Sequence, residues 1–206
     1  MIDPGGGLTA RASPTTVSGM RRLAVVAMLL APTAASARPA SQGVYAEAGL
    51  GAAATLGKAA DWTQPGPALA LRVGYDLFSW FSVGVAADAS THEATVPAPP
   101  TGEYVQLYRA RADARLTARV QMIALYAEGG AGAAMLSSNV LEKVGVQDPG
   151  QRFALAFAAG GGLEYQLQNR HYAVGLGGEY FLAPGFDALA GIEVRVFLRY
   201  TYGGAR

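Results

Sequence analysis

The sequence predicts an all-β protein: an eight-stranded antiparallel up-and-down transmembrane β-barrel, preceded by a cleavable signal peptide. Three observations support this prediction. Segments in which polar or very small side chains alternate with larger apolar ones recur along the chain, and a period of two is that of a β-strand. Long and short connections alternate between these segments. The N-terminal region has the features of an export signal.

The export signal has a basic, an apolar and a cleavage region. Arg21 and Arg22 precede an apolar run that is too short to span a membrane, and small residues follow it. A buried or anchoring helix is the alternative, but Pro32 breaks the run. We therefore expect a signal peptide at residues 1–37 (1–19 lying upstream of an alternative start at Met20), a periplasmic lead-in at 38–42, the barrel at 43–202 and a tail at 203–206.

Eight segments are expected to form the strands, and none of them has the helical period. They are residues 44–52, 68–77, 81–88, 108–119, 123–135, 153–167, 172–180 and 192–202. Three long loops are expected at residues 57–67, 90–103 and 137–151. Residues 45–53 resemble residues 126–134, and residues 81–88 resemble residues 172–179, as expected of a barrel built from equivalent hairpins.

The strand at residues 108–119 has the most highly charged face, and the polar faces of the other strands complement it. Together, these polar faces carry seven acidic residues and seven arginines, whereas both lysines of the mature chain lie in the long loops. Arginine suits multidentate pairing with carboxylates in a confined space. We therefore expect a closed ion-pair network in the lumen, made of Glu47, Arg72, Asp88, Arg109, Arg111, Asp113, Arg115, Arg119, Glu128, Glu164, Glu179, Glu193, Arg195 and Arg199.

The apolar face carries aromatic residues near both strand ends. Tyr75, Phe81, Tyr165, Tyr172, Tyr200 and Tyr202 lie toward the short turns, and Tyr108, Phe153 and Tyr180 lie toward the long loops. Two such girdles, separated by an apolar band of ~25 Å, are typical of outer-membrane barrels. A soluble lipocalin-type barrel with an apolar cavity is the alternative, but it would expose the lysine-free charges to water and leave the girdles unexplained.

With these features, nearly everything after residue 42 resembles the small eight-stranded outer-membrane barrels of the OmpA/OmpX type. The resemblance implies a multi-pass protein of a Gram-negative outer membrane, surrounded by its lipid and inserted by the barrel-assembly machinery through the last strand. Residues 196–202 are similar to the signal that this machinery reads, although residues 203–206 follow where family members commonly end on an aromatic residue. An even strand number puts both termini in the periplasm.

Several kinds of chemistry are not supported by the residues. The chain has no Cys and two His, which makes a metal site improbable, and the Gly-rich segment at residues 49–54 has no βαβ unit around it, so no cofactor is expected. Without residues 1–37 the chain has 13 basic and 14 acidic residues, a net charge of −1, which does not suggest a nucleic-acid partner. Ser90, His92 and Glu93 are the residue types of a lipid A deacylase, but sequence neighbours on an extended strand diverge, so we expect a solvated loop histidine and no catalytic residue.

The remaining function classes are a structural or surface-interaction barrel and a narrow small-solute channel, with a lipid A-modifying enzyme as a less favoured third class. Eight strands leave an interior just wide enough for side chains, which favours the first class. An extracellular ligand or surface partner, whose identity the sequence does not give, would bind the long loops. The candidate residues for that surface are Trp62, His92, Leu141, Val144 and Val146.

Overall fold

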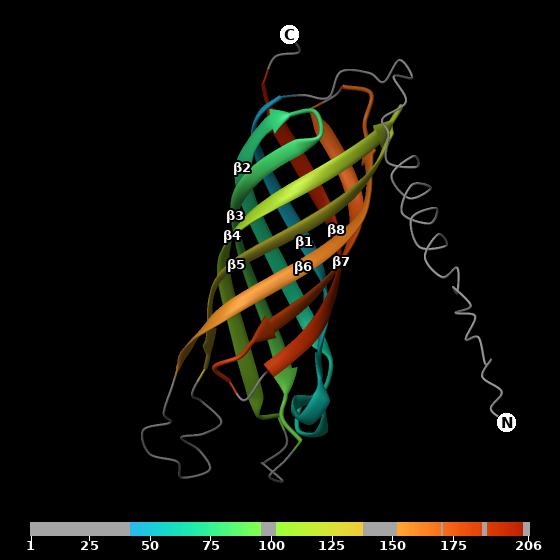
Figure 1. The fold of residues 1–206 in the computed structure, drawn as a ribbon. Helices are drawn as coiled ribbons and strands as arrows, with labels where there is room; N and C mark the ends of the chain where they lie inside the picture. The colour runs from blue at the N-terminus through green and yellow to red at the C-terminus, as the bar shows by residue number, and fades with distance from the viewer. Residues whose placement is uncertain (1–41, 96–101, 138–151, 170, 187–188, 204–206) are drawn as a thin grey trace, which may run out of the picture. The chain divides into compact units, whose positions relative to one another are not determined.

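The computed structural model describes residues 42–95, 102–137, 152–169, 171–186 and 189–203. Eight antiparallel strands pair there in sequence order, and β8 pairs with β1 to close a barrel, which confirms the predicted fold class (Figure 1). The expected signal peptide and Leu141, Val144 and Val146 lie outside the described residues. The elements are β1 (Gly43–Leu56), the 3-10 helix η1 (Gly57–Asp61), β2 (Gly66–Phe78), β3 (Phe81–Glu93), β4 (Tyr104–Val120), β5 (Ile123–Leu136), β6 (Phe153–Gln166), β7 (Tyr172–Ala183) and β8 (Leu189–Tyr202).

The two ends of the barrel differ in their connections. Short turns follow β2, β4 and β6, and we call this the short-turn end; β1 begins there and β8 ends there, since Val44 pairs with Tyr202. At the opposite end, which we call the long-loop end, η1 lies and β3 and β5 finish (Figure 1). The alternation of long and short connections in the sequence is therefore an alternation between two ends of one barrel.

The strands at the long-loop end extend beyond the predicted bounds. β3 continues to Glu93 and β4 begins at Tyr104, so that His92 pairs with Val105 inside a ladder where the sequence suggested a loop. The polar residues at positions 90–93 keep the alternation of inner and outer faces, and the ladder satisfies their backbone groups. The prediction that residues 90–93 belong to a loop is wrong.

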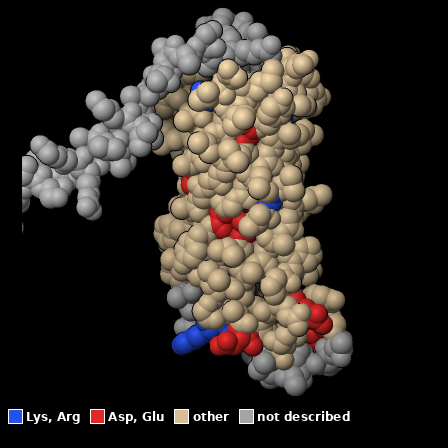
Figure 2. All heavy atoms as spheres, turned by 90° about the vertical axis from the view of Figure 1, so that its right-hand side faces the viewer, with Lys and Arg blue, Asp and Glu red and all other residues tan. Residues whose placement is uncertain are grey.

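The two faces of the barrel wall have opposite polarity. Large apolar side chains point outward, with Leu50 69% and Val196 63% exposed, whereas glutamates and arginines are buried inside. Figure 2 shows that charged atoms form only small spots on the wall and gather at the long-loop end. A soluble barrel would show the reverse pattern. No helix in the described part of the chain is long and apolar enough to cross a membrane.

Candidate functional site

The lumen of the barrel is the best-defined polar site. The structure places all fourteen residues that the sequence assigned to an ion-pair network on the inner face of the wall. Twelve of them are buried, and Asp113 and Arg119 are partly buried. Strand alternation accounts for this placement, because every second residue points inward. The lumen has three layers: an apolar plug at the long-loop end, a central ion-pair network and a polar recess at the short-turn end.

Glu179, on β7, lies at the centre of the network. Its carboxylate is 3.1 Å from Arg72 Nη2, 3.1 Å from Arg109 Nη1 and 3.4 Å from Arg195 Nη1, and it also bonds to Arg111. These arginines come from β2, β4 and β8, so one carboxylate connects strands on opposite sides of the lumen. A buried carboxylate with four guanidinium neighbours is a strong cross-link between strands.

Glu128, on β5, forms a second centre closer to the short-turn end. It accepts hydrogen bonds from Arg72, Arg195 and Arg115, with 2.9 Å between Arg115 Nη2 and Glu128 Oε2. Because Arg72 and Arg195 also contact Glu179, the two centres share cations. The network is therefore continuous across the lumen, and side chains occupy the path that a solute would take.

Aromatic rings fill the spaces between the ion pairs. The guanidinium of Arg115 lies 4.2 Å from the ring centre of Tyr126 and 5.7 Å from that of Phe197, and the guanidinium of Arg199 lies 3.8 Å from the ring centre of Tyr45. At the other end of the network, Arg109 lies over Phe181. The attraction between a guanidinium and the face of an aromatic ring offsets part of the free energy that the cation loses when it leaves water. Tyr45, Tyr126 and Phe197 share a strand face with charged residues in the sequence, but we predicted no role for them or for Phe181.

Glycines on the inner face provide the room for these rings. A Cβ atom at Gly175 would lie 2.2 Å from the tip of Phe197, and one at Gly177 would lie 2.3 Å from the hydroxyl oxygen of Tyr126. Any other residue at either position would displace the ring that stacks on Arg115. The Gly-rich polar faces are thus complementary to a few large side chains, as a narrow interior requires.

An apolar plug closes the long-loop end of the lumen. It consists of Ala59 from η1 together with inward residues at the ends of β4 to β8, and its buried members are Ala59, Leu107, Ala134, Ala156, Phe181, Ala183 and Leu189. Trp62, a candidate for the extracellular surface, packs against this plug and is only partly exposed. Thr63 anchors the segment, since its hydroxyl donates to the carbonyl oxygen of Ala59 over 2.9 Å. The first long connection is therefore folded into the mouth of the barrel.

His92 lies inside the barrel and not on its surface. Its side chain points into the barrel and is 1% exposed, so the prediction of a solvated loop histidine is wrong. Ser90 Oγ lies 3.0 Å from His92 Nε2, and the carbonyl oxygen of Gln64 lies 3.1 Å from Nδ1. A carbonyl can only accept, so Nδ1 carries the proton and Nε2 accepts from the hydroxyl. Residues two apart share a strand face, so this pair does form, contrary to our expectation.

The Ser90–His92 pair lacks two features of a hydrolytic relay. Both side chains are buried, and the imidazole is oriented by a backbone carbonyl where a relay would use a carboxylate. The pair instead fixes the position of Gln64. The backbone N–H of Gln64 also donates to the backbone carbonyl oxygen of Glu93 over 2.9 Å. Its role in this geometry is to hold the first connection against β3.

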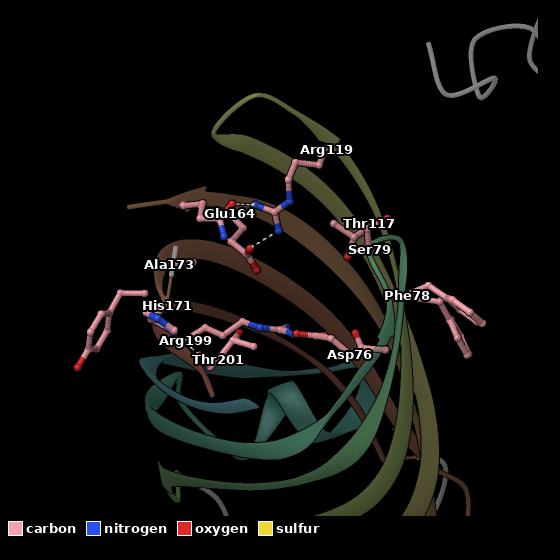
Figure 3. Close-up of a pocket in the computed structure, with 14 residues that line it drawn as sticks. Asp76, Phe78, Ser79, Thr117, Arg119, Glu164, His171, Ala173, Arg199 and Thr201 are labelled. Carbon is pink, nitrogen blue, oxygen red and sulfur yellow. Dashed lines mark hydrogen bonds and ion pairs between the residues drawn. The ribbon is translucent and has the colours of Figure 1, made fainter. Parts of the chain in front are cut away.

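A polar recess lies at the short-turn end (Figure 3). Arg119 donates to Glu164 over 2.8 Å and to Gln166 over 3.1 Å, and Arg199 bonds to Asp76. Asp76 was on a polar face in the sequence but absent from the predicted network. The recess has a volume of about 30 Å³, which is room for ordered water and not for a larger solute. This end of the lumen therefore has room for water only up to the ion-pair network.

The lumen groups are paired with one another and not arranged around an empty position. Among the residues that the structure describes, no group of three His, Asp or Glu side chains has the arrangement of a metal site. The geometry is that of a rigid, charge-filled interior, and it supports cross-linking of the wall better than transport through it.

Comparisons with known proteins agree with this architecture. A family model described as an outer membrane protein beta-barrel domain matches residues 23–202. No curated protein matches the chain. Among solved structures, Neisserial surface protein A superposes with a TM-score of 0.57 at 14% identity, covering 78% of this chain and 97% of that one.

Further solved structures share the fold more loosely. The N-terminal β-barrel domain of Pseudomonas aeruginosa OprF has a TM-score of 0.47 at 12% identity and covers 78% of this chain and 99% of that one. Ail of Yersinia pestis, solved in complex with the heparin analogue sucrose octasulfate, has a TM-score of 0.43 at 16% identity and covers 78% and 99%. The predicted resemblance to small outer-membrane barrels is confirmed by the family match. The chain therefore belongs to the outer membrane protein beta-barrel domain family, and its apolar wall faces the lipid of an outer membrane.

Proposed function

We propose that this protein is a structural or surface-interaction barrel that acts through the loops at its long-loop end. The observation that carries the proposal is the occluded lumen: the apolar plug and the ion-pair network fill the interior between the two mouths. A barrel with no open path presents only its ends and its wall to other molecules. The long-loop end holds the connections with the greatest length and chemical variety, and such loops commonly carry binding functions.

Electrical recording distinguishes this proposal from the alternative, a narrow channel for small solutes. We expect the purified mature protein, inserted in planar lipid bilayers, to give no steady single-channel currents, because guanidinium and carboxylate groups occupy the axis of the lumen. Regular unitary currents in the wild-type protein would favour the channel. The variant Phe181→Ala serves as a comparison, since it removes one closing side chain and the ring under Arg109 but no charged residue of the network.

The proposal requires that the long-loop end face the outside of the cell. Short turns lie on the periplasmic side in bacterial barrels, and β1 begins and β8 ends at the short-turn end, so both termini are assigned to the periplasm. Protease added to intact cells is expected to cut within residues 96–101 or 138–151 and to spare the connections at residues 79–80 and 121–122. Cleavage confined to the short turns would contradict the orientation and the proposed function together.

The surface available to a partner is narrower than the sequence suggested. His92 is buried and Trp62 is largely committed to the apolar plug, so these two residues are withdrawn from the candidate surface. Leu141, Val144 and Val146 stay candidates, as part of the third long loop. An extracellular ligand is therefore expected to engage the loops after β3 and β5 more than the first connection.

A further inference from the structure

The interior of the barrel contains one more acidic residue than arginines. The fourteen residues of the ion-pair network are seven acids and seven arginines, and Asp76 adds an eighth acid to the inner face. His92, on the same face, binds Ser90 and Gln64 as a neutral imidazole. With every acid ionised, the part of the interior that the structure describes would therefore carry a net charge of −1.

Asp113, on β4, is the acid that the arginines leave without a hydrogen bond. Each of the other seven acids accepts at least one hydrogen bond from a guanidinium group, and each of the seven arginines donates at least one. Among the residues that the structure describes, Asp113 Oδ2 has no hydrogen-bond partner, and its ion pair with Arg72 Nη1 is 3.5 Å long. Arg72 already donates to Glu128 and Glu179. The surplus negative charge is therefore located at Asp113.

The cations around Asp113 are all shared with other acids. The side chain of Asp113 is only 6% exposed, and its partners in the two neighbouring strands are Gly84 and Gly130, which have no side chain to offer. The titratable and charged groups that face it from β1, β2, β4 and β5 are Tyr45, Arg72, Arg111, Arg115 and Glu128. All three arginines in this set donate to carboxylates other than Asp113.

We propose that the Asp113 carboxyl group binds one proton and stays neutral in the folded barrel at neutral pH. A buried ionisable group without a counter-charge of its own is more stable in its neutral form, because burial penalises the charged form. With Asp113 neutral, seven ionised acids match seven arginines, and the interior has no net charge. The protonated oxygen is also a hydrogen-bond donor, whereas an ionised carboxylate only accepts.

Two other positive charges could balance the interior in place of this proton. One is a protonated His92, which pairs with Val105, eight residues along β4 from Asp113 and about 26 Å away at ~3.3 Å per residue. An imidazolium at that distance would interact only weakly with the carboxylate. The other is a monovalent cation such as sodium, which would leave Asp113 ionised.

Infrared spectroscopy detects a protonated carboxyl group directly. The full mature chain is folded in dodecyl maltoside micelles, which contain no carbonyl group, and its spectrum is recorded at pH 8, where an ordinary aspartate is ionised. We expect a carboxylic acid C=O band above the amide I band that shifts in D2O, and we expect Asp113→Asn to lack this band. Absence of the band from the wild type, or its persistence in Asp113→Asn, would overturn the proposal.

Glu93→Gln is the matched control for Asp113→Asn. It makes the same conversion of a carboxyl to an amide on an outward-facing residue of β3, outside the lumen, and is expected to keep the band. Heat-modifiable gel mobility checks that both variants are folded. Loss of the band in Glu93→Gln as well would show that it does not come from the lumen, and the proposal would be wrong.

The pH dependence of stability is a second measurement, and it needs no variant. A proton that is bound in the folded state and absent from the unfolded state is released on unfolding, so the equilibrium constant for unfolding rises about tenfold per pH unit. We expect this rise between pH 7 and 8, above the range in which an ordinary histidine titrates, in urea titrations of the wild type in lipid vesicles. Asp113→Asn is expected to show no such rise.

Two results of the urea titrations would contradict the bound proton. A wild-type stability that does not fall as the pH rises would mean that Asp113 is already ionised in the folded barrel. A wild-type stability that changes when choline replaces sodium at constant ionic strength would assign the missing positive charge to a bound cation. Either result would overturn the proposal.

Discussion

Replacing Glu179 with alanine is expected to produce one of the two largest losses of stability available by single substitution in this barrel. The change removes the one carboxylate shared by Arg72, Arg109, Arg111 and Arg195. Each of these arginines keeps a second acid, namely Glu128, Glu193 or Asp88, but the buried network is left with one positive charge that is not balanced. Removing one partner of a buried pair costs ~3–5 kcal/mol, because the remaining charge is stranded. Urea titration of the protein in lipid vesicles, followed by tryptophan fluorescence, measures the change in the free energy of unfolding.

Glu93→Ala is the matched control for this substitution. It deletes the same side chain at the long-loop end of β3, outside the network. We expect its effect to stay within about 0.5 kcal/mol, as for surface substitutions. If Glu179→Ala unfolds at the same urea concentration as Glu93→Ala, the lumen is open to water and the ion pairs are screened, which would also weaken the argument against a channel.

The sequence was sufficient to predict which side chains point into the lumen and which point outward, because side chains alternate along a strand with a fixed period. The inward position of Glu47, Arg72 and Glu128 required only the alternation within each strand. Closure into eight strands followed from the count of alternating segments and from the absence of a helical period. These features are local, and a single sequence contains them.

The pairing across the lumen could not be predicted, because it depends on the register and tilt of all eight strands together. Arg72 and Glu179 are neighbours although β2 and β7 are not paired to each other. Alternation alone places Asp76 on the inner face, so leaving it out of the predicted network was wrong; only its contact with Arg199 depends on the closed barrel. Which carboxylate meets which guanidinium is a property of the assembled wall.

The ends of the strands were predicted less well than their centres. Residues 90–93 are polar and precede a Pro-rich segment, so they had the composition of a loop. In the structure the Ser90, His92 and Gln64 contacts satisfy the polar groups inside, and the strand continues. The apolar plug was missed because Ala59 and Trp62 belong to a connection whose inward fold has no periodic signal.

The second large effect is expected at Arg115, even for a change that keeps its charge. Its guanidinium contacts Glu47 and Glu128, each at 2.9 Å, while its plane lies against the ring of Tyr126. An ammonium group cannot make a planar, multidentate set of contacts and stack on an aromatic face at the same time. Hydrogen bonds to charged groups contribute ~1.5–3 kcal/mol each, so Arg115→Lys is expected to cost at least ~2 kcal/mol in the same urea titration.

Arg119→Lys separates the geometry of the guanidinium from the presence of a cation. Arg119 lies at the polar recess, where its side chain is 12% exposed and contacts Glu164 at 2.8 Å. Water there can complete the hydration of an ammonium group, so the substitution is expected to cost less than about 1 kcal/mol. Equal losses in the two variants would mean that the stacked arrangement around Arg115 adds nothing beyond its charge. A larger loss at Arg115 would show that the Gly-lined space for Tyr126 and Phe197 serves to hold a planar cation in the closed lumen.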